Sequence, residues 1–179
     1  MRPVWLTPPG QAPGAGADNL LLARHPHVSR DGSHLSVVVG PGNGGSAWRY
    51  SIRSGAQPVR LTFVKPGGVH YPIWRPAGDA LTYLAIGERF GLFTSVADGA
   101  SNTRSSVVPR SDAVPEDWTP DGATLIYQSV SAMTGVDLLL HDQRTGEDRP
   151  WLQTQFDEAE ARLSPDGRWV AYVSNQTGR

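Results

Sequence analysis

The chain has 179 residues, enough for one domain with a sizeable hydrophobic core. Its formal net charge of −1 gives no electrostatic reason to expect a nucleic-acid partner, and the absence of cysteine excludes disulfides and thiolate metal sites. No apolar run approaches the roughly 18 residues that a membrane span needs, and the N-terminus lacks the apolar stretch of a signal peptide. We therefore expect no direct membrane insertion by this chain, and the sequence leaves its compartment open.

Glycine and proline separate short apolar runs along the chain, which is typical of an all-β protein. One pattern occurs four times, as VSRDGSHLSVVV, WRPAGDALTYLA, WTPDGATLIYQS and LSPDGRWVAYVS. Its glycines, Gly32, Gly78, Gly122 and Gly167, are 46, 44 and 45 residues apart. A second series, Gly10, Gly55, Gly99 and Gly146, has spacings of 45, 44 and 47 residues. Two markers with one period indicate internal duplication, and a period near 45 residues is typical of solenoids, propellers and repeat arrays.

In chain order, residues 3–23 predict the third and fourth strands of a unit whose first half is missing. Complete four-stranded units follow at 25–63, 70–108 and 114–154, and residues 159–173 predict the first two strands of another unit. The run after each first-series glycine alternates with period two, as Leu35 and Val37 illustrate. No stretch free of turn signals carries an apolar stripe with helical spacing, so we expect no helix of consequence.

Four-stranded units of this length are the blades of a β-propeller, in which each sheet covers its neighbour. The residues that precede the turns, Val28, Trp74, Trp118 and Leu163, should therefore fill the spaces between blades. Residues 1–179 then form a single partial propeller of three full blades and two half blades. We expect an open arc of a larger ring; in the alternative, the two half blades pair and close a four-bladed ring.

The closing segment RLSPDGRWVAYVSNQTGR closely resembles the Ser-Pro-Asp-Gly repeat of TolB-type β-propellers. The longer run from Pro150 to Arg179, and Val59 to Pro76, are similar to propellers that follow the kinase domain of bacterial serine/threonine protein kinases or stand alone. Arg30 and Ala77 depart from the Pro and Asp of the pattern. The resemblance covers nearly the whole chain, and it implies a bacterial, extracytoplasmic propeller whose complete ring has six or more blades.

Gly40, Gly42 and Gly45 match the G-x-G-x-x-G spacing of a dinucleotide site. Such a site needs a helix after the glycines, whereas SAWRYSIR alternates like a strand. We therefore interpret these glycines as an ordinary hairpin loop and expect no cofactor.

No catalytic residues are predicted, because the chain has no G-x-S-x-G nucleophile motif and no kinase catalytic motif. His25 and His27 could offer two metal ligands, but no third ligand follows from the spacing. We expect no metal.

Polar residues gather at the start of each unit's first strand, which is the innermost strand of a propeller blade. This ring at the channel mouth is the candidate ligand site: His25, His27, His70, Tyr71, Glu116, Asp117, Glu158, Glu160 and Arg162. The alternative is that these residues are solvated loop charges.

The predicted function is a non-catalytic interaction or sensor module that binds a protein, a peptide or a small ligand at the channel mouth. It would belong to a larger bacterial protein, such as a receptor-like serine/threonine kinase or a TolB-like protein. The alternatives are the propeller portion of a serine peptidase of the prolyl-oligopeptidase type and a propeller enzyme with its active site in the channel.

Overall fold

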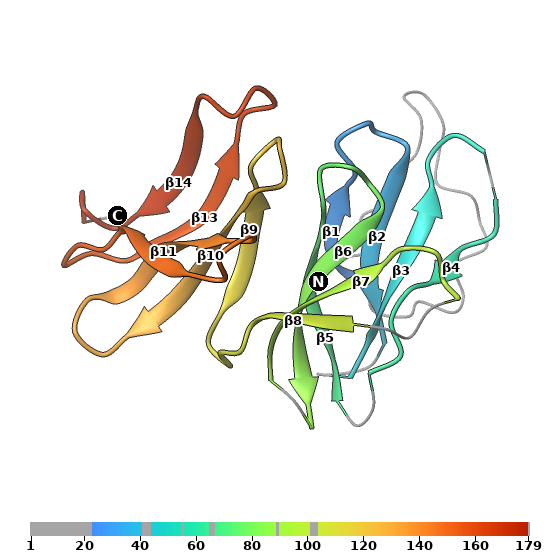
Figure 1. Cartoon of the computed structure of the whole chain (residues 1–179), viewed down its shortest axis with the longest axis horizontal. Helices are drawn as coiled ribbons and strands as arrows, with labels where there is room; N and C mark the ends of the chain where they lie inside the picture. The colour runs from blue at the N-terminus through green and yellow to red at the C-terminus, as the bar shows by residue number, and fades with distance from the viewer. Residues whose placement is uncertain are drawn as a thin grey trace.

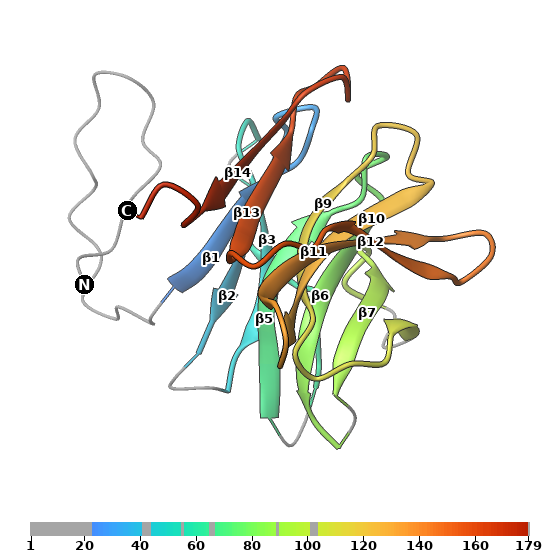
Figure 2. The ribbon, with the colours of Figure 1, turned by 90° about the vertical axis from the view of Figure 1, so that its left-hand side faces the viewer.

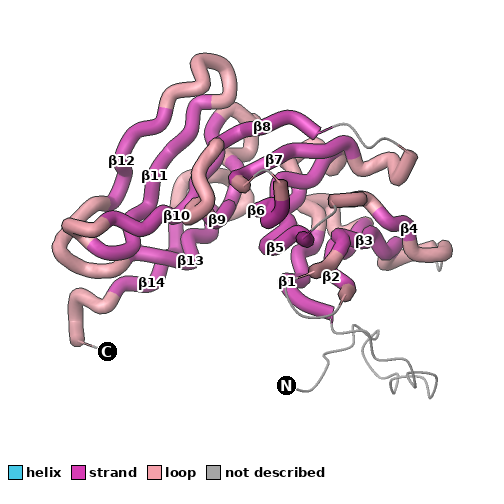
Figure 3. Tube along the Cα trace, turned by 90° about the horizontal axis from the view of Figure 1, so that it is seen from below, coloured by secondary structure: helices cyan, strands magenta, loops and turns pink. Residues whose placement is uncertain are grey.

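The computed structural model describes residues 23–40, 44–54, 56–64, 67–88, 90–100 and 104–178. These residues form strands, turns and loops without any helix, so no described segment is a helix that could cross a membrane (Figure 3). Except for its last residue, the half blade predicted at 3–23 lies outside the described residues.

Three antiparallel four-stranded sheets and one two-stranded sheet follow one another along the chain (Figure 1). Sheet 1 has β1 (Ala23–Val28), β2 (His34–Val39), β3 (Ser46–Ser51) and β4 (Val59–Arg60). Sheet 2 has β5 (Gly67–Trp74), β6 (Ala80–Gly87), β7 (Gly91–Val96) and β8 (Arg104–Val108). Sheet 3 has β9 (Val114–Trp118), β10 (Thr124–Ser131), β11 (Gly135–Asp142) and β12 (Asp148–Leu152). Sheet 4 has β13 (Glu158–Leu163) and β14 (Val170–Ser174).

Strands pair in chain order within every sheet, and the first strands β1, β5, β9 and β13 contact one another in sequence. This arrangement is an open arc of β-propeller blades, which confirms the predicted all-β fold class. Because the blades share one topology, residues at the same place in the repeat occupy equivalent positions in the four sheets.

The turn between the first two strands of each blade is fixed by local hydrogen bonds. In sheet 3, Asp121 accepts hydrogen bonds from the hydroxyl of Thr119 (2.6 Å) and the backbone N–H of Ala123 (3.0 Å). Gly122 has a φ of +70°, a conformation that glycine adopts without steric cost. The Asp and Gly of the repeat are therefore turn residues, as the sequence predicts.

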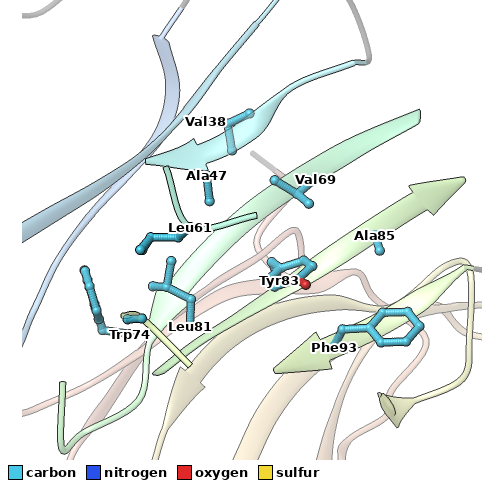
Figure 4. Packing of buried hydrophobic residues seen from close by; sticks show 10 residues of the cluster. Val38, Ala47, Leu61, Val69, Trp74, Leu81, Tyr83, Ala85 and Phe93 are labelled. Carbon is cyan, nitrogen blue, oxygen red and sulfur yellow. The ribbon is translucent and has the colours of Figure 1, made fainter. Parts of the chain in front are cut away.

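The hydrophobic cores lie between neighbouring sheets, so each blade is buried by the next. Figure 4 shows the core between sheets 1 and 2, where Val38 and Ala47 of sheet 1 meet Val69, Trp74 and Leu81 of sheet 2. A second core joins sheets 2 and 3, and a third joins sheets 3 and 4. Period-two alternation sends neighbouring residues of one strand into different cores.

Trp74 and Trp118 fill the first two of these junctions. They are 3% and 1% exposed, and their indole N–H groups donate to His27 O (3.2 Å) and to Thr82 Oγ1 (3.1 Å) of the preceding sheet. Leu163 packs against the third core. Val28, by contrast, is 45% exposed, because no described sheet covers that side of sheet 1.

The turns between the first and second strands of the four blades gather on one side of the molecule (Figures 1 and 2). Between sheets 2 and 3, Arg75 Nη2 donates to the carbonyl oxygen of Gly122 (3.3 Å). Arg30 Nη1 donates to the carbonyl oxygen of Pro165 (3.2 Å), which joins the turns of sheets 1 and 4. The two ends of the described arc therefore approach each other on this side of the molecule.

Gly40 and Gly45 of the glycine-rich segment lie in the connection between β2 and β3, and Gly42 lies outside the described residues. Strand β3 begins at Ser46, where a dinucleotide site would require a helix. The segment is thus a connection between two strands of one sheet.

We expect Gly91→Ala to destabilise the fold more than Gly146→Ala. A Cβ on Gly91 would lie 2.5 Å from Val108 O, at a φ of +130°, whereas one on Gly146 meets nothing within 4 Å at a φ of +74°. The first substitution should lower the free energy of unfolding by roughly 2–4 kcal/mol, and the second by about 1 kcal/mol. Urea unfolding of both variants measures this difference, and equal losses would contradict the proposed close approach of β7 and β8.

Candidate functional site

A β-bulge interrupts the first strand of every blade at the same place in the repeat. The pairing register shifts between Arg24 and His27, between His70 and Ile73, between Pro115 and Asp117, and between Ala159 and Arg162. Bulges re-aim side chains and are over-represented at functional sites. The bulges therefore determine which side chains of the innermost strands face the inner surface of the arc.

Three of the bulged residues have a positive φ although none is glycine. His25 and Tyr71 have a φ of 51°, and Glu160 has a φ of 56°. The equivalent residue of sheet 3 is Pro115, whose ring holds φ near −65° and forbids this conformation. Non-glycine residues with a positive φ are strained by about 1–2 kcal/mol, and such strain clusters at ligand sites.

The strain at Glu160 can be tested by substitution. Glu160→Gly should raise the free energy of unfolding by about 0.5 kcal/mol, because glycine relieves the positive φ but loses more entropy on folding. Glu160→Val should lower it by about 1–2 kcal/mol, since a β-branched residue tolerates this conformation poorly. Thermal melts of both variants, with Glu147→Gly as the exposed control, measure the effect, and a stabilising Glu160→Val would exclude strain at this position.

His25, His70 and Tyr71 form an aromatic cluster where sheets 1 and 2 meet. The rings of His25 and Tyr71 are 4.1 Å apart at their centroids, and those of His25 and His70 are 5.9 Å apart. Burial, followed by the nearby His70 and Arg24, lowers the pKa of His25, so its imidazole is neutral at neutral pH. Tyr71 is 40% exposed, so part of this residue is accessible to a ligand.

Glu116 and Arg162 form an ion pair between sheets 3 and 4. Arg162 Nη1 donates to Glu116 Oε2 (2.8 Å), to Glu116 O (2.7 Å) and to Ala161 O (2.7 Å). Glu116 is 4% exposed, and this burial raises the pKa of its carboxyl, which Arg162 and the backbone N–H of Glu160 oppose. The side chain of Arg162 is 53% exposed, so the buried carboxylate of Glu116 binds one nitrogen, Nη1, of a partly exposed side chain.

His27 and Asp117 occupy equivalent positions and link neighbouring sheets. The backbone N–H of Trp74 donates to His27 Nδ1 (3.2 Å), and that of Leu163 donates to Asp117 Oδ2 (2.9 Å). Burial lowers the pKa of His27 to about 4, with Asp117 raising it and Arg162 lowering it further. The sequence gives no sign of these structural contacts, because they depend on the placement of adjacent sheets.

Glu158 lies apart from these groups. It is 3% exposed and accepts a hydrogen bond from Thr154 Oγ1 in the segment that joins sheets 3 and 4. The nine predicted residues thus divide into an aromatic cluster, the Glu116–Arg162 pair with Glu160, the linking residues His27 and Asp117, and the separate Glu158.

The structure offers no cluster that could perform metal chemistry within its described residues. No three His, Asp or Glu side chains come together there as metal ligands. His27 uses Nδ1 for the contact with Trp74, and His25 packs against Tyr71. A shallow pocket lies where the first turns of sheets 2 and 3 meet, and it is lined by residues of these turns and of β6 and β7: Arg75, Pro76, Ala77, Asp79, Ala80, Thr94, Pro120, Asp121 and Gly122.

No family model matches the chain. A TolB-like protein of Agrobacterium tumefaciens superposes with a TM-score of 0.74 and 20% identity, over 89% of this chain and 56% of that chain. TolB of Acinetobacter baumannii gives a TM-score of 0.65 and 16% identity, over 84% of this chain and 37% of that chain. A structure from a study of two prolyl endopeptidases gives a TM-score of 0.60 and 15% identity, over 85% of this chain and 26% of that chain.

These similarities confirm the TolB-type β-propeller fold that the Ser-Pro-Asp-Gly repeat predicts. The chain spans about half of the length of the first protein and about a third of the second. The prolyl endopeptidase likeness shows that the same blade architecture also occurs in peptidases.

Proposed function

We propose that this chain is a non-catalytic interaction module that binds a ligand or partner at the mouth formed by its innermost strands. The observation that supports this best is the set of strained bulges, which present His25, Tyr71 and Glu160 at equivalent positions of different blades. A rigid sheet framework that holds strained, partly exposed side chains is suited to recognition, because these side chains need little ordering on binding. Among the described residues, no set of nucleophile, base and oxyanion donors accompanies them.

A peptide is the partner class that we favour. The mouth combines an exposed aromatic ring, neutral imidazoles and charged groups of both signs, which suits a chain with mixed polar and apolar side chains. The module would act within a larger bacterial protein, of the TolB-like kind or as the sensor of a receptor-like serine/threonine kinase. Its location would then be extracytoplasmic.

The propeller portion of a serine peptidase is the second candidate, and the likeness to the prolyl endopeptidase structure favours it. The catalytic residues would then lie outside this sequence, because it contains no G-x-S-x-G motif. The two candidates differ in a simple measurement. If the chain is an interaction module, it should by itself bind peptides without cleaving them. If it is the propeller portion of a peptidase, it should by itself neither bind peptides tightly nor cleave them.

The test selects peptides from a synthetic random dodecapeptide library with free C-termini on the immobilised full chain. Tyr71→Ala should lower the affinity for the selected peptides by about tenfold, because the substitution removes an exposed aromatic contact. Tyr172→Ala is the matched control, since Tyr172 is 44% exposed but lies on β14, outside the mouth. Equal weakening by both substitutions, or failure to select any peptide, would count against the proposed function.

A further inference from the structure

The hydrogen-bond acceptors on the inner surface near Arg162 are already satisfied. Asp117 accepts from Trp118 N through Oδ1 (2.8 Å) and from Leu163 N through Oδ2 (2.9 Å). Glu116 accepts from Arg162 and from the backbone N–H of Glu160. These carboxylates are therefore committed to the protein, and neither has a strong need for a cationic ligand.

Arg162, by contrast, has hydrogen-bond donors that no described residue uses. All three hydrogen bonds of Arg162 are made by Nη1, so its Nε and Nη2 donate to nothing within the described residues. A guanidinium presents the N–H groups of Nε and Nη2 as a planar fork that matches the two oxygens of a carboxylate. The half-exposed side chain places this fork in contact with solvent.

We propose that the free Nε–Nη2 fork of Arg162 binds a carboxylate of the ligand. Glu116 is a positioning residue in this site, because it fixes Nη1 and thereby the direction of the fork. The inference rests on the proposed function and narrows the ligand to a molecule that carries a carboxylate. A peptide C-terminus and a sugar acid share this chemistry.

Glu160 and Asp117 are negative groups that oppose an anionic ligand. Glu160 is exposed, so water screens its charge, whereas the fork of Arg162 would make direct hydrogen bonds. Planar bidentate geometry also separates the proposed site from a general cationic patch, because a lysine provides the charge but no fork.

The experiment titrates the ¹⁵N-labelled full chain with three probes and follows the Nε–Hε signal of Arg162 by NMR. The probes are N-acetyl-trialanine with a free C-terminus, the same peptide as its C-terminal amide, and glucuronate. We expect the free carboxylate to shift the Arg162 signal and to bind about tenfold more tightly than the amide. Glucuronate binding in place of the peptide would identify a sugar acid as the source of the carboxylate.

Substitutions separate the fork from charge alone. Arg162→Lys and Arg162→Gln should each weaken binding of the peptide with a free carboxylate by about tenfold. Arg168→Gln, in the exposed turn between β13 and β14, is the control and should leave binding within about twofold. Glu116→Gln should weaken binding by several fold and broaden the Arg162 signal, as expected of a positioning residue.

Equal binding of the free peptide and its amide, together with no binding of glucuronate, would overturn the inference, and this comparison needs no variant that must fold. Full affinity in Arg162→Lys would also overturn it, since charge alone would then suffice. If the selected peptides still require Tyr71 but tolerate C-terminal amidation and Arg162→Gln, the proposed function stands and the carboxylate inference fails. Loss of the Tyr71 requirement would instead count against the proposed function.

Discussion

Trp118→Ala should lower the free energy of unfolding by about 3–5 kcal/mol, the largest loss that we expect from one side chain. Trp118 is 1% exposed and lies in the core between sheets 2 and 3. The substitution removes the indole from that core and leaves Thr82 Oγ1 without its hydrogen bond from Nε1. It also removes the ring on which the guanidinium of Arg75 stacks at 4.6 Å.

Trp169→Ala is the matched control, because Trp169 is the same residue type but is 74% exposed. Its loss should change the free energy of unfolding by less than about 0.5 kcal/mol. Trp118→Phe should lower the free energy of unfolding by an intermediate amount, because phenylalanine retains an aromatic ring but lacks the N–H donor. Urea unfolding followed by far-UV circular dichroism measures all three. Similar losses for Trp118→Ala and Trp169→Ala would contradict mutual burial of the blades as the main source of stability.

Lowering the pH from 6.5 to 4 should remove about 3 kcal/mol of stability through His27 alone. The pKa of His27 is about 4 in the folded chain against 6.5 for an ordinary histidine, because burial disfavours its charged form. Between these values the unfolded chain binds a proton that the folded chain does not, so stability falls as the pH falls. Above about pH 7.5 and below about pH 3, His27 should contribute almost no slope.

His27→Asn isolates this contribution. The amide oxygen of asparagine takes the place of Nδ1 as acceptor for the N–H of Trp74 and does not titrate. The variant should be within about 1 kcal/mol of the wild type at pH 5 and should lack most of the slope between pH 6.5 and 4. Because His25 titrates in the same direction, some slope should remain. Urea unfolding at several pH values measures the difference, and an unchanged slope in His27→Asn would show that His27 is not the responsible group.

The repeated blades could be predicted from the sequence because their signals are local. Turn residues such as Asp121 and Gly122 determine a conformation within four residues, and alternation along Leu81 and Tyr83 fixes which side of a strand is buried. Repetition of these signals near every 45 residues then implies sheets that cover each other. The all-β propeller fold needed no further information.

The candidate site could be predicted only as a region. The sequence places its residues on the first strand of each unit, but the bulges change which side chains face inward, and Pro115 interrupts the pattern in one blade only. The exposure of residues at the ends of the arc could not be predicted either. Val28 and Trp74 are equivalent in the repeat, but only Trp74 is buried by a neighbouring sheet.

By itself, therefore, the sequence determined the strands, the turns and the period of the repeat, because each depends on interactions between residues close in the chain. Only the tertiary structure decided that His27 accepts a hydrogen bond from the next blade and that Glu116 holds Arg162 from 46 residues away. Such contacts depend on the distance and angle between sheets, which result from the packing of all the cores together. No local pattern encodes them.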